Sequence, residues 1–237
     1  TWGSLEDRLT ARAQRYSRAD CSLHGALSLA YRLVIFDFDG TLADSGDWFI
    51  SMTNGVADRF KFRRITDEEV DMLRGRSSRE VVEYMGVAKW KMPLIAIHAR
   101  KLVAQHASNI PLFPGVPELL HGLRRSGVTI ALVSSNSEAN IRKILGPELS
   151  ALVTYFNCGA SMFGKTPKFR AVLRKARVAP KDVISIGDET RDIEAAAKAG
   201  VSSGAVTWGY ARPEILAAHN PTVLFMGMDE ILPTVVG

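Results

Sequence analysis

The chain has 237 residues, of which 46% are hydrophobic, and its formal net charge at pH 7 is +5. A chain of this length can bury a substantial core, and we expect two domains. Its basic residues are spread along the sequence instead of being clustered, which argues against nucleic-acid binding and leaves an anionic small molecule as a compatible partner.

The cysteines and the hydropathy pattern exclude further classes. Cys21 and Cys158 lie far apart without metal-ligand spacing, so neither a disulfide framework nor a zinc site is indicated, and a cytoplasmic location is expected. No apolar stretch reaches the roughly 18 to 20 residues that cross a bilayer, so no membrane partner is expected. The sequence carries no signal for an oligomeric state.

Residues 1–30 form an extension whose role the sequence does not reveal. Arginines and serines in this segment faintly suggest a transit peptide, but Glu6, Asp7 and Asp20 argue against one. Apolar residues at helical spacing would allow a short amphipathic helix, namely Leu5, Leu9, Ala13 and Tyr16.

A short apolar run, Leu33 to Phe36, ends in two aspartates, Asp37 and Asp39, followed by Gly40 and Thr41. The run has the length and β-branched content of a buried parallel strand, and ligands bind at the carboxyl ends of such strands in open α/β sheets. The alternation places both acids on one side of the backbone, and glycine then permits a sharp turn. Either aspartate alone could merely cap a turn, but together they predict a paired-carboxylate site.

Residues 46–112, which we term the helical insertion, have helical periodicity throughout and no convincing buried strand. Capping boxes at Thr66 to Glu69 and Ser77 to Glu80 predict two helix starts. Another helix is expected over Met92 to His106. Its apolar residues Leu94, Ile97, Leu102 and Val103 could share one face.

After the insertion, helices and strands alternate, which predicts an α/β fold: a Rossmann-like doubly wound parallel sheet that also contains the opening strand. Pro117 is placed to begin the first of these helices. The expected elements are helix 118–125, strand 128–133, helix 138–145, strand 155–158, helix 168–176, strand 183–186, helix 192–199, strand 204–208, helix 213–219 and strand 223–225.

Three further polar groups follow at or near predicted strand ends. Ser134, Ser135 and Asn136 come after one strand, Lys165 stands just before a helix, and Asp188 and Asp192 follow another strand. Taken singly, each group could have a purely structural role, as a helix cap or a surface charge. Several carboxylates at one sheet edge would repel one another unless a cation joined them, and hard oxygen ligands suit Mg²⁺.

The four motifs, in this order, resemble those of the haloacid dehalogenase superfamily of phosphohydrolases. Its first motif is DxDGT, its second a Ser or Thr at a strand end, its third a Lys commonly followed by Pro, and its fourth GDxxxD. The run 204–214 further resembles the phosphoglycolate-phosphatase-like branch. The resemblance implies an α/β catalytic core of residues 31–45 and 113–237, and a small helical cap of residues 46–112 that closes over the site.

The resemblance also implies residue roles and a small phosphorylated metabolite as substrate. Asp37 would be the nucleophile that forms an aspartyl phosphate, and Asp39 the proton carrier. Mg²⁺ would be held by Asp37, the Asp39 backbone carbonyl, Asp188 and Asp192. Phosphate binding would fall to Ser134, Ser135 and Lys165, loop support to Gly40 and Thr41, and specificity to Arg76 and Asn136, whereas Trp208 and Tyr210 are interpreted as packing residues.

Alternatives within the superfamily differ in single residues. Dehalogenases lack the second acid of the first motif, so Asp39 argues against halide displacement, and residues 44–60 lack the lysine that phosphonatases use for an imine. A β-phosphoglucomutase-like mutase shares all four motifs and stays open beside the phosphatase. A non-catalytic descendant that binds a partner is disfavoured by the intact set of acids.

Overall fold

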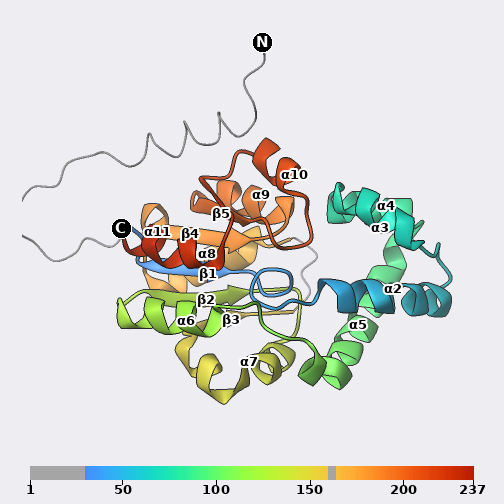
Figure 1. Ribbon diagram of the computed structural model, residues 1–237, viewed down its shortest axis with the longest axis horizontal. Helices are drawn as coiled ribbons and strands as arrows, with labels where there is room; N and C mark the ends of the chain where they lie inside the picture. Colours follow the sequence, from blue (N-terminus) through green and yellow to red (C-terminus); the bar gives the residue numbers. More distant parts are fainter. Residues whose placement is uncertain (1–29, 160–163) are drawn as a thin grey trace, which may run out of the picture.

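The computed structural model describes residues 30–159 and 164–237. The amphipathic helix expected within residues 1–30 lies outside them. Six strands form one parallel sheet in the order β3-β2-β1-β4-β5-β6 (Figure 1), which confirms the predicted doubly wound α/β architecture. The strands are β1 (Leu33–Phe36), β2 (Thr129–Val133), β3 (Tyr155–Asn157), β4 (Val183–Gly187), β5 (Ser202–Val206) and β6 (Val223–Phe225).

The first strand of the chain lies at the centre of the sheet. β1 pairs with β2 on one side and with β4 on the other, so that Phe36 lies opposite both Leu132 and Ile186. All four residues of β1 are fully buried, as its unbroken apolar sequence predicts for a strand covered on both faces. This register brings the carboxyl ends of β1, β2 and β4 to one edge of the sheet.

Helices cover both faces of the sheet. One apolar cluster packs α6 (Val116–Arg125), α7 (Glu138–Leu152) and α11 (Ile231–Val236) against one face, and a second packs α8 (Thr166–Ala176) and α9 (Thr190–Ala199) against the other. Alternate side chains of β1 point into the two clusters, with Val34 and Phe36 in the first and Leu33 and Ile35 in the second. Leu216 of α10 (Pro213–Ala218) packs with Ile193 of α9 and Ala205 of β5.

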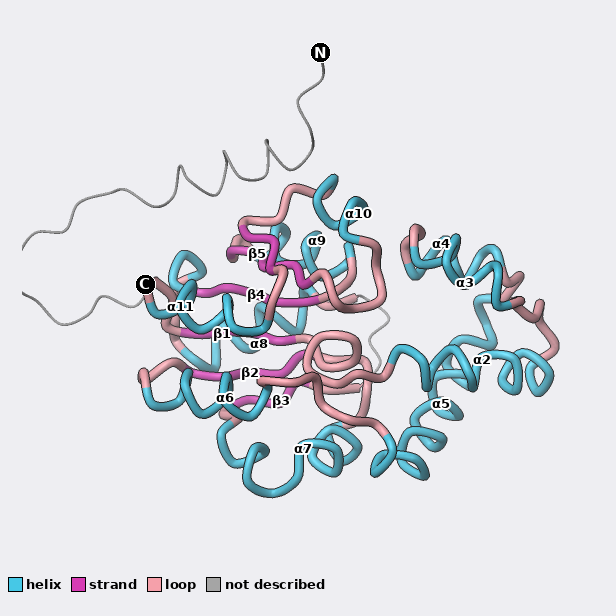
Figure 2. The backbone as a smooth tube through the Cα atoms, viewed as in Figure 1, coloured by secondary structure: helices cyan, strands magenta, loops and turns pink. Residues whose placement is uncertain are grey.

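The helical insertion contains α2 (Gly46–Phe60), α3 (Asp67–Arg74), α4 (Ser78–Tyr84) and α5 (Met92–His106). These helices lie beyond the carboxyl ends of the strands, and loops fill the region between them and the sheet (Figures 1 and 2). Both predicted capping boxes are confirmed. The chain enters and leaves the insertion side by side, because the Asp44 amide donates to the Pro111 carbonyl at 2.9 Å and the Phe113 amide to the Leu42 carbonyl at 2.9 Å.

Several sequence-based boundaries need correction. The strand expected over 204–208 is Ser202–Val206, because Thr207 and Trp208 already belong to the loop beside the predicted site. The helix expected to end at Leu145 resumes to Leu152 after an interruption at Gly146, whose φ of 73° is accessible to glycine. The prediction that α5 buries one shared apolar face is wrong, since Val103 is buried whereas Leu94 and Ile97 are exposed. The described residues also form short 3-10 turns: η2 (Lys89–Lys91), η3 (Ala107–Asn109), η4 (Pro180–Asp182) and η5 (Met228–Glu230).

Within the described part of the chain, no helix combines the length and the apolar character needed to cross a membrane.

Candidate active site

The site lies where the three central strands end. Asp37 follows β1, Ser134 follows β2, and Asp188 follows β4. The Asp37 amide donates to the Ile186 carbonyl at 2.8 Å, which extends the ladder by one residue and fixes the direction of the backbone that carries the acids. The three side chains are buried although they are polar, so each needs partners inside the protein.

Lys165 links two of the carboxylates. Its Nζ lies 2.5 Å from Asp37 Oδ2 and also forms an ion pair with Asp192 Oδ1. Burial alone would lower the pKa of Lys165, but the neighbouring carboxylates of Asp192 and Asp37 outweigh it and raise this pKa, so the ammonium stays charged. Lys168 points elsewhere, because its Nζ donates to the backbone carbonyls of Ser134, at 2.7 Å, and of Gly159. The structure thus brings Lys165, not Lys168, to the acids.

Asp188 is held by neutral donors. Thr41 Oγ1 donates to its Oδ1 at 3.0 Å, and the Tyr210 backbone amide donates to its Oδ2 at 2.9 Å. Burial, with the nearby negative charges of Glu189, Asp37 and Asp192, raises the pKa of Asp188. The carboxylate is therefore oriented but not neutralised by its hydrogen-bond partners.

The acidic cluster fits a divalent cation. Carboxylate oxygens of Asp37, Asp188 and Asp192 all lie within 4.8 Å of one another, and the three residues are buried. Three carboxylates facing the one ammonium of Lys165 leave two negative charges uncompensated when all are ionised. A hard dication with oxygen ligands would balance this charge. The side chain of Asp39 is not part of this group of three carboxylates.

Asp39 has a different environment from Asp37. Asn136 Nδ2 lies 3.3 and 3.4 Å from its two carboxylate oxygens. Burial, and then the charge of Asp37, raise the pKa of Asp39 to about 7. The two acids of the first motif are therefore unequal: one is paired with a lysine, and the other can hold a proton near neutral pH.

Asn136 is fixed by a network that the sequence analysis did not include. Its Oδ1 accepts from Asn140 Nδ2 at 3.0 Å and from the Ser137 amide at 2.9 Å, which turns its amide nitrogen toward Asp39. Asn140 also donates to the Arg100 carbonyl of α5 at 2.9 Å. The predicted specificity residue Asn136 thus touches the acid of the site and is braced by a side chain that also contacts the insertion.

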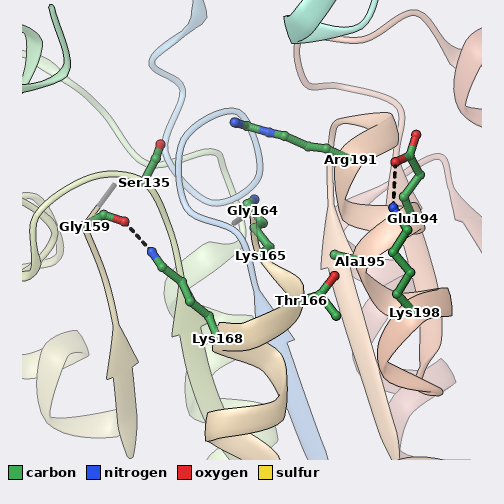
Figure 3. Close-up of a pocket in the computed structure, with 10 residues that line it drawn as sticks. All are labelled: Ser135, Gly159, Gly164, Lys165, Thr166, Lys168, Arg191, Glu194, Ala195 and Lys198. Carbon is green, nitrogen blue, oxygen red and sulfur yellow. Dashed lines mark hydrogen bonds and ion pairs between the residues drawn. The ribbon is translucent and has the colours of Figure 1, made fainter. Parts of the chain in front are cut away.

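A cavity of about 190 Å³ opens beside Lys165 (Figure 3). Ser135, which is exposed, and Arg191 line it together with Lys168 and Lys198. Ser134 is buried, and its Oγ accepts from the Asn136 amide at 3.0 Å. Four basic side chains line the cavity, namely Lys165, Lys168, Arg191 and Lys198, against one acidic side chain, Glu194. The excess of positive charge suits an anion.

Comparison with known proteins gives the family. A sequence profile described as haloacid dehalogenase-like hydrolase matches residues 34–206. The chain belongs to this family. The match contains all four motifs, so the predicted resemblance is confirmed.

Two curated relatives of this hydrolase show the range of its family. A phosphoglycolate phosphatase from Synechococcus elongatus is 32% identical over 203 residues, covering 85% of this chain and 96% of the relative. The tyrosine-protein kinase PtkA of Mycobacterium tuberculosis is 28% identical over 199 residues, covering 81% of this chain and 68% of the relative. The predicted class, a phosphoric monoester hydrolase, is confirmed by the phosphatase relatives.

A solved structure shows the same fold. A haloacid dehalogenase-like family hydrolase from Streptococcus pneumoniae superposes with a TM-score of 0.72 at 19% sequence identity. The superposition covers 86% of this chain and 98% of that protein. At this identity the likeness supports the fold and not a shared substrate.

Sequence reasoning about this hydrolase missed several contacts. Arg76, a predicted specificity residue, has its guanidinium carbon 5.1 Å from the centroid of the Tyr84 ring within the insertion. Its neighbour Arg74 instead donates to the core, at the Gly209 and Tyr210 carbonyls. Trp208 packs against the core as expected, but its Nε1 also donates to the Thr41 carbonyl at 3.2 Å. No local pattern marks the hydrogen bonds of Arg74 and Trp208, because each joins residues more than 130 positions apart.

Proposed function

We propose that the protein is a Mg²⁺-dependent phosphatase that hydrolyses a small phosphomonoester through an aspartyl-phosphate intermediate. The cluster of Asp37, Asp188 and Asp192, in which Asp37 and Asp192 pair with the Lys165 ammonium, carries the proposal. Such a cluster can stabilise the charge that a phosphoryl group spreads over its oxygens during transfer. Family membership and the phosphatase relatives agree with this chemistry.

In the first step, a carboxylate oxygen of Asp37 attacks phosphorus, and the bond from phosphorus to the leaving oxygen breaks. The leaving oxygen takes the proton of the Asp39 carboxyl group, so the product departs as a neutral alcohol. In the second step, a water oxygen attacks phosphorus while the Asp39 carboxylate takes a water proton. The bond between phosphorus and Asp37 then breaks, which releases phosphate and restores both acids.

The surrounding residues of the chain bind and orient the phosphoryl group. Lys165 neutralises charge on Asp37 and on a phosphoryl oxygen, and Ser134 and Ser135 supply further donors at the start of α7. Thr41 and Gly40 fix the turn after Asp39. Asp37, the Asp39 carbonyl, Asp188 and Asp192 would hold Mg²⁺, which when bound supplies Lewis-acid stabilisation of the phosphoryl oxygens.

The substrate we propose is small and resembles phosphoglycolate. The Synechococcus relative with this activity supports the choice, as does the position of the helical insertion, which would act as a cap that excludes bulk water. Arg76 could pair with the carboxylate of such a substrate if its side chain left the Tyr84 ring. We propose a cytoplasmic location as well, because the scarcity of cysteine fits a reducing compartment.

A phosphate-release assay tests the proposal. The purified protein with Mg²⁺ should release phosphate from phosphoglycolate or a related small ester, and Asp37→Asn should abolish both turnover and phosphoenzyme formation. Asp58→Asn, which removes an exposed acid of α2, should keep wild-type activity. The catalytic proposal would be refuted by phosphoenzyme trapped on the Asp37→Asn protein, or by no release from any member of a broad phosphoester panel. Isomerisation of a phosphosugar without net release would favour the mutase.

A further inference from the structure

One arginine of the helical insertion is hydrogen-bonded to a loop of the core beside the acidic cluster. Arg74 is the last residue of α3, and its Nε and Nη2 donate to the carbonyls of Tyr210 and Gly209, each at 3.0 Å. In return, the Arg212 amide donates to the Arg74 carbonyl at 3.1 Å. Three hydrogen bonds therefore join the end of α3 to the loop of residues 207–212, and two of them are charge-assisted.

The 207–212 loop also holds the acidic cluster. The Tyr210 amide that donates to Asp188 Oδ2 lies in the same residue whose carbonyl accepts from Arg74. Trp208 Nε1 donates to the Thr41 carbonyl, and Thr41 Oγ1 donates to the other Asp188 oxygen. Both oxygens of Asp188 are thus oriented by groups that the loop supplies or contacts.

Gly209 allows the backbone of the 207–212 loop to pack directly on Asp188. A Cβ atom at this position would lie 2.1 Å from the Asp188 Cβ and 2.6 Å from the Gly40 carbonyl oxygen. The loop backbone therefore packs directly on Asp188 and on the turn of the first motif, with no space for a side chain between them. A shift of the loop would move the Asp188 carboxylate or break its hydrogen bond.

From these contacts we propose that Arg74 is a positioning residue that couples the seating of the helical insertion to the orientation of Asp188. This inference rests on the proposed Mg²⁺-dependent function. When α3 lies against the core, Arg74 fixes the 207–212 loop and the loop fixes Asp188 for the cation. When α3 moves away, two loop carbonyls lose their donors and Asp188 loses its restraint. Closing the insertion and completing the metal site are then one event.

Two other contacts belong to the same interface. Ser78 Oγ of α4 donates to a carboxylate oxygen of Glu189, and Arg212 pairs with Asp71 of α3. They align the insertion beside the 207–212 loop, but neither donates to an oxygen of Asp188. Arg74 differs from them because it donates to the carbonyl of Tyr210, and the amide of the same residue donates to Asp188, a candidate metal ligand.

The experiment measures Mn²⁺ binding to the full chain by electron paramagnetic resonance, without substrate. Partners that orient a metal ligand typically contribute 10- to 100-fold in metal affinity, so Arg74→Ala should weaken Mn²⁺ binding by about 10-fold. Arg74→Lys keeps the charge but lacks the planar fork that serves two carbonyls, so its loss should be intermediate. Arg79→Ala is the matched control, since Arg79 is an exposed insertion arginine whose ion pair is with exposed Glu83, across 3.4 Å.

Activity supplies the second readout. For Arg74→Ala, raising the Mg²⁺ concentration should restore most of kcat, which a general loss of structure would not allow. Wild-type Mn²⁺ affinity in Arg74→Ala, or an equal loss in Arg79→Ala, would overturn the inference. If Arg74→Ala does not fold, wild-type affinity in Arg74→Lys overturns it instead. A wild-type protein that binds no Mn²⁺ would overturn the proposed function as well, which separates the two failures.

Discussion

The edge of the sheet and the helical insertion are packed in opposite ways. Every residue of β1 is fully buried, and Asp37 and Thr41, which follow it, are buried with defined partners. The helices of the insertion have few fully buried residues: α2 buries only Ala57, α3 only Leu73 and α5 only Val103. Trp90 and Leu94 are 71% and 51% exposed. Tertiary packing thus stabilises the core, whereas helix caps and local ion pairs contribute a larger share of the stability of the insertion.

The insertion also contains an apolar pocket. An apolar cavity of about 200 Å³ lies among α2, α4 and α5, lined by side chains that include Trp48, Phe49 and Met85. Unfilled apolar volume lowers packing energy and permits side chains to rearrange. The proposed catalytic groups therefore lie on the densely packed part of the protein, whereas the helical insertion, which would meet the substrate as a cap, is packed less densely.

The largest effect should come from Asp39, the proposed proton carrier at the edge of the sheet. Asp39→Asn should lower turnover of an alkyl phosphate by about 10²- to 10⁴-fold, because the poor leaving group then lacks its proton donor. With p-nitrophenyl phosphate, which needs no proton to leave, the first step should survive and a burst of nitrophenol should precede slow hydrolysis. Stopped-flow measurement checks this. An equal loss for both substrates with no burst would contradict the unequal roles of Asp37 and Asp39.

A matched pair of leucines tests the packing difference directly. Leu120→Ala on α6 removes a fully buried side chain and should lower the free energy of unfolding by about 2–5 kcal/mol. Leu94→Ala on α5 removes an exposed one and should change it by less than about 0.5 kcal/mol. Urea unfolding followed by circular dichroism measures both. Similar losses at the two positions would show that the insertion is as tightly packed as the core.

The helix caps should matter more locally than globally. Ser77 Oγ accepts from the Glu80 amide at 3.3 Å, so Ser77→Ala should destabilise α4 by about 1 kcal/mol. Hydrogen exchange should speed up in α4 and stay unchanged in β1 and β4. Faster exchange in the central strands would mean that the insertion and the core unfold as one unit.

The smallest effect concerns acid pH. Hydrogen bonds from Tyr84, Thr66 and Arg63 lower the pKa of Glu69 to about 2. Because the folded state favours the ionised carboxylate, this contribution to stability is complete above the ordinary glutamate pKa of about 4.5 and is lost as the pH falls toward 2. Thermal melts between pH 6 and pH 3 should therefore show a steeper acid loss for the wild type than for Glu69→Gln. Parallel curves would contradict this, and added salt should shrink the difference.

The sequence predicted the core better than the insertion, for a physical reason. A strand covered on both faces must be a continuous apolar run, and a polar residue at its end is visible in the sequence. This made Asp37, Ser134 and Asp188 identifiable as neighbours before the fold was known. On α5, by contrast, apolar residues at helical spacing suggested one buried face, but Leu94 and Ile97 are exposed.

The distinction between Lys165 and Lys168 needed the resemblance as well as the pattern. Both lysines stand near the start of α8, and only the family motif favoured the first. The structure shows the reason for the difference, because Lys165 faces Asp37 and Asp192, whereas Lys168 is bound to the carbonyls of Ser134 and Gly159.

By itself, the sequence determined the parallel sheet, the helical insertion and the set of acids at the strand ends, because burial and periodicity are local properties of the chain. Only the tertiary structure decided which groups orient those acids. Asn136 turns toward Asp39, the Tyr210 amide holds Asp188, and Arg74 reaches the Tyr210 carbonyl from the insertion. These contacts involve backbone atoms, which every residue carries, or join segments far apart in the chain. Neither property leaves a pattern in the sequence.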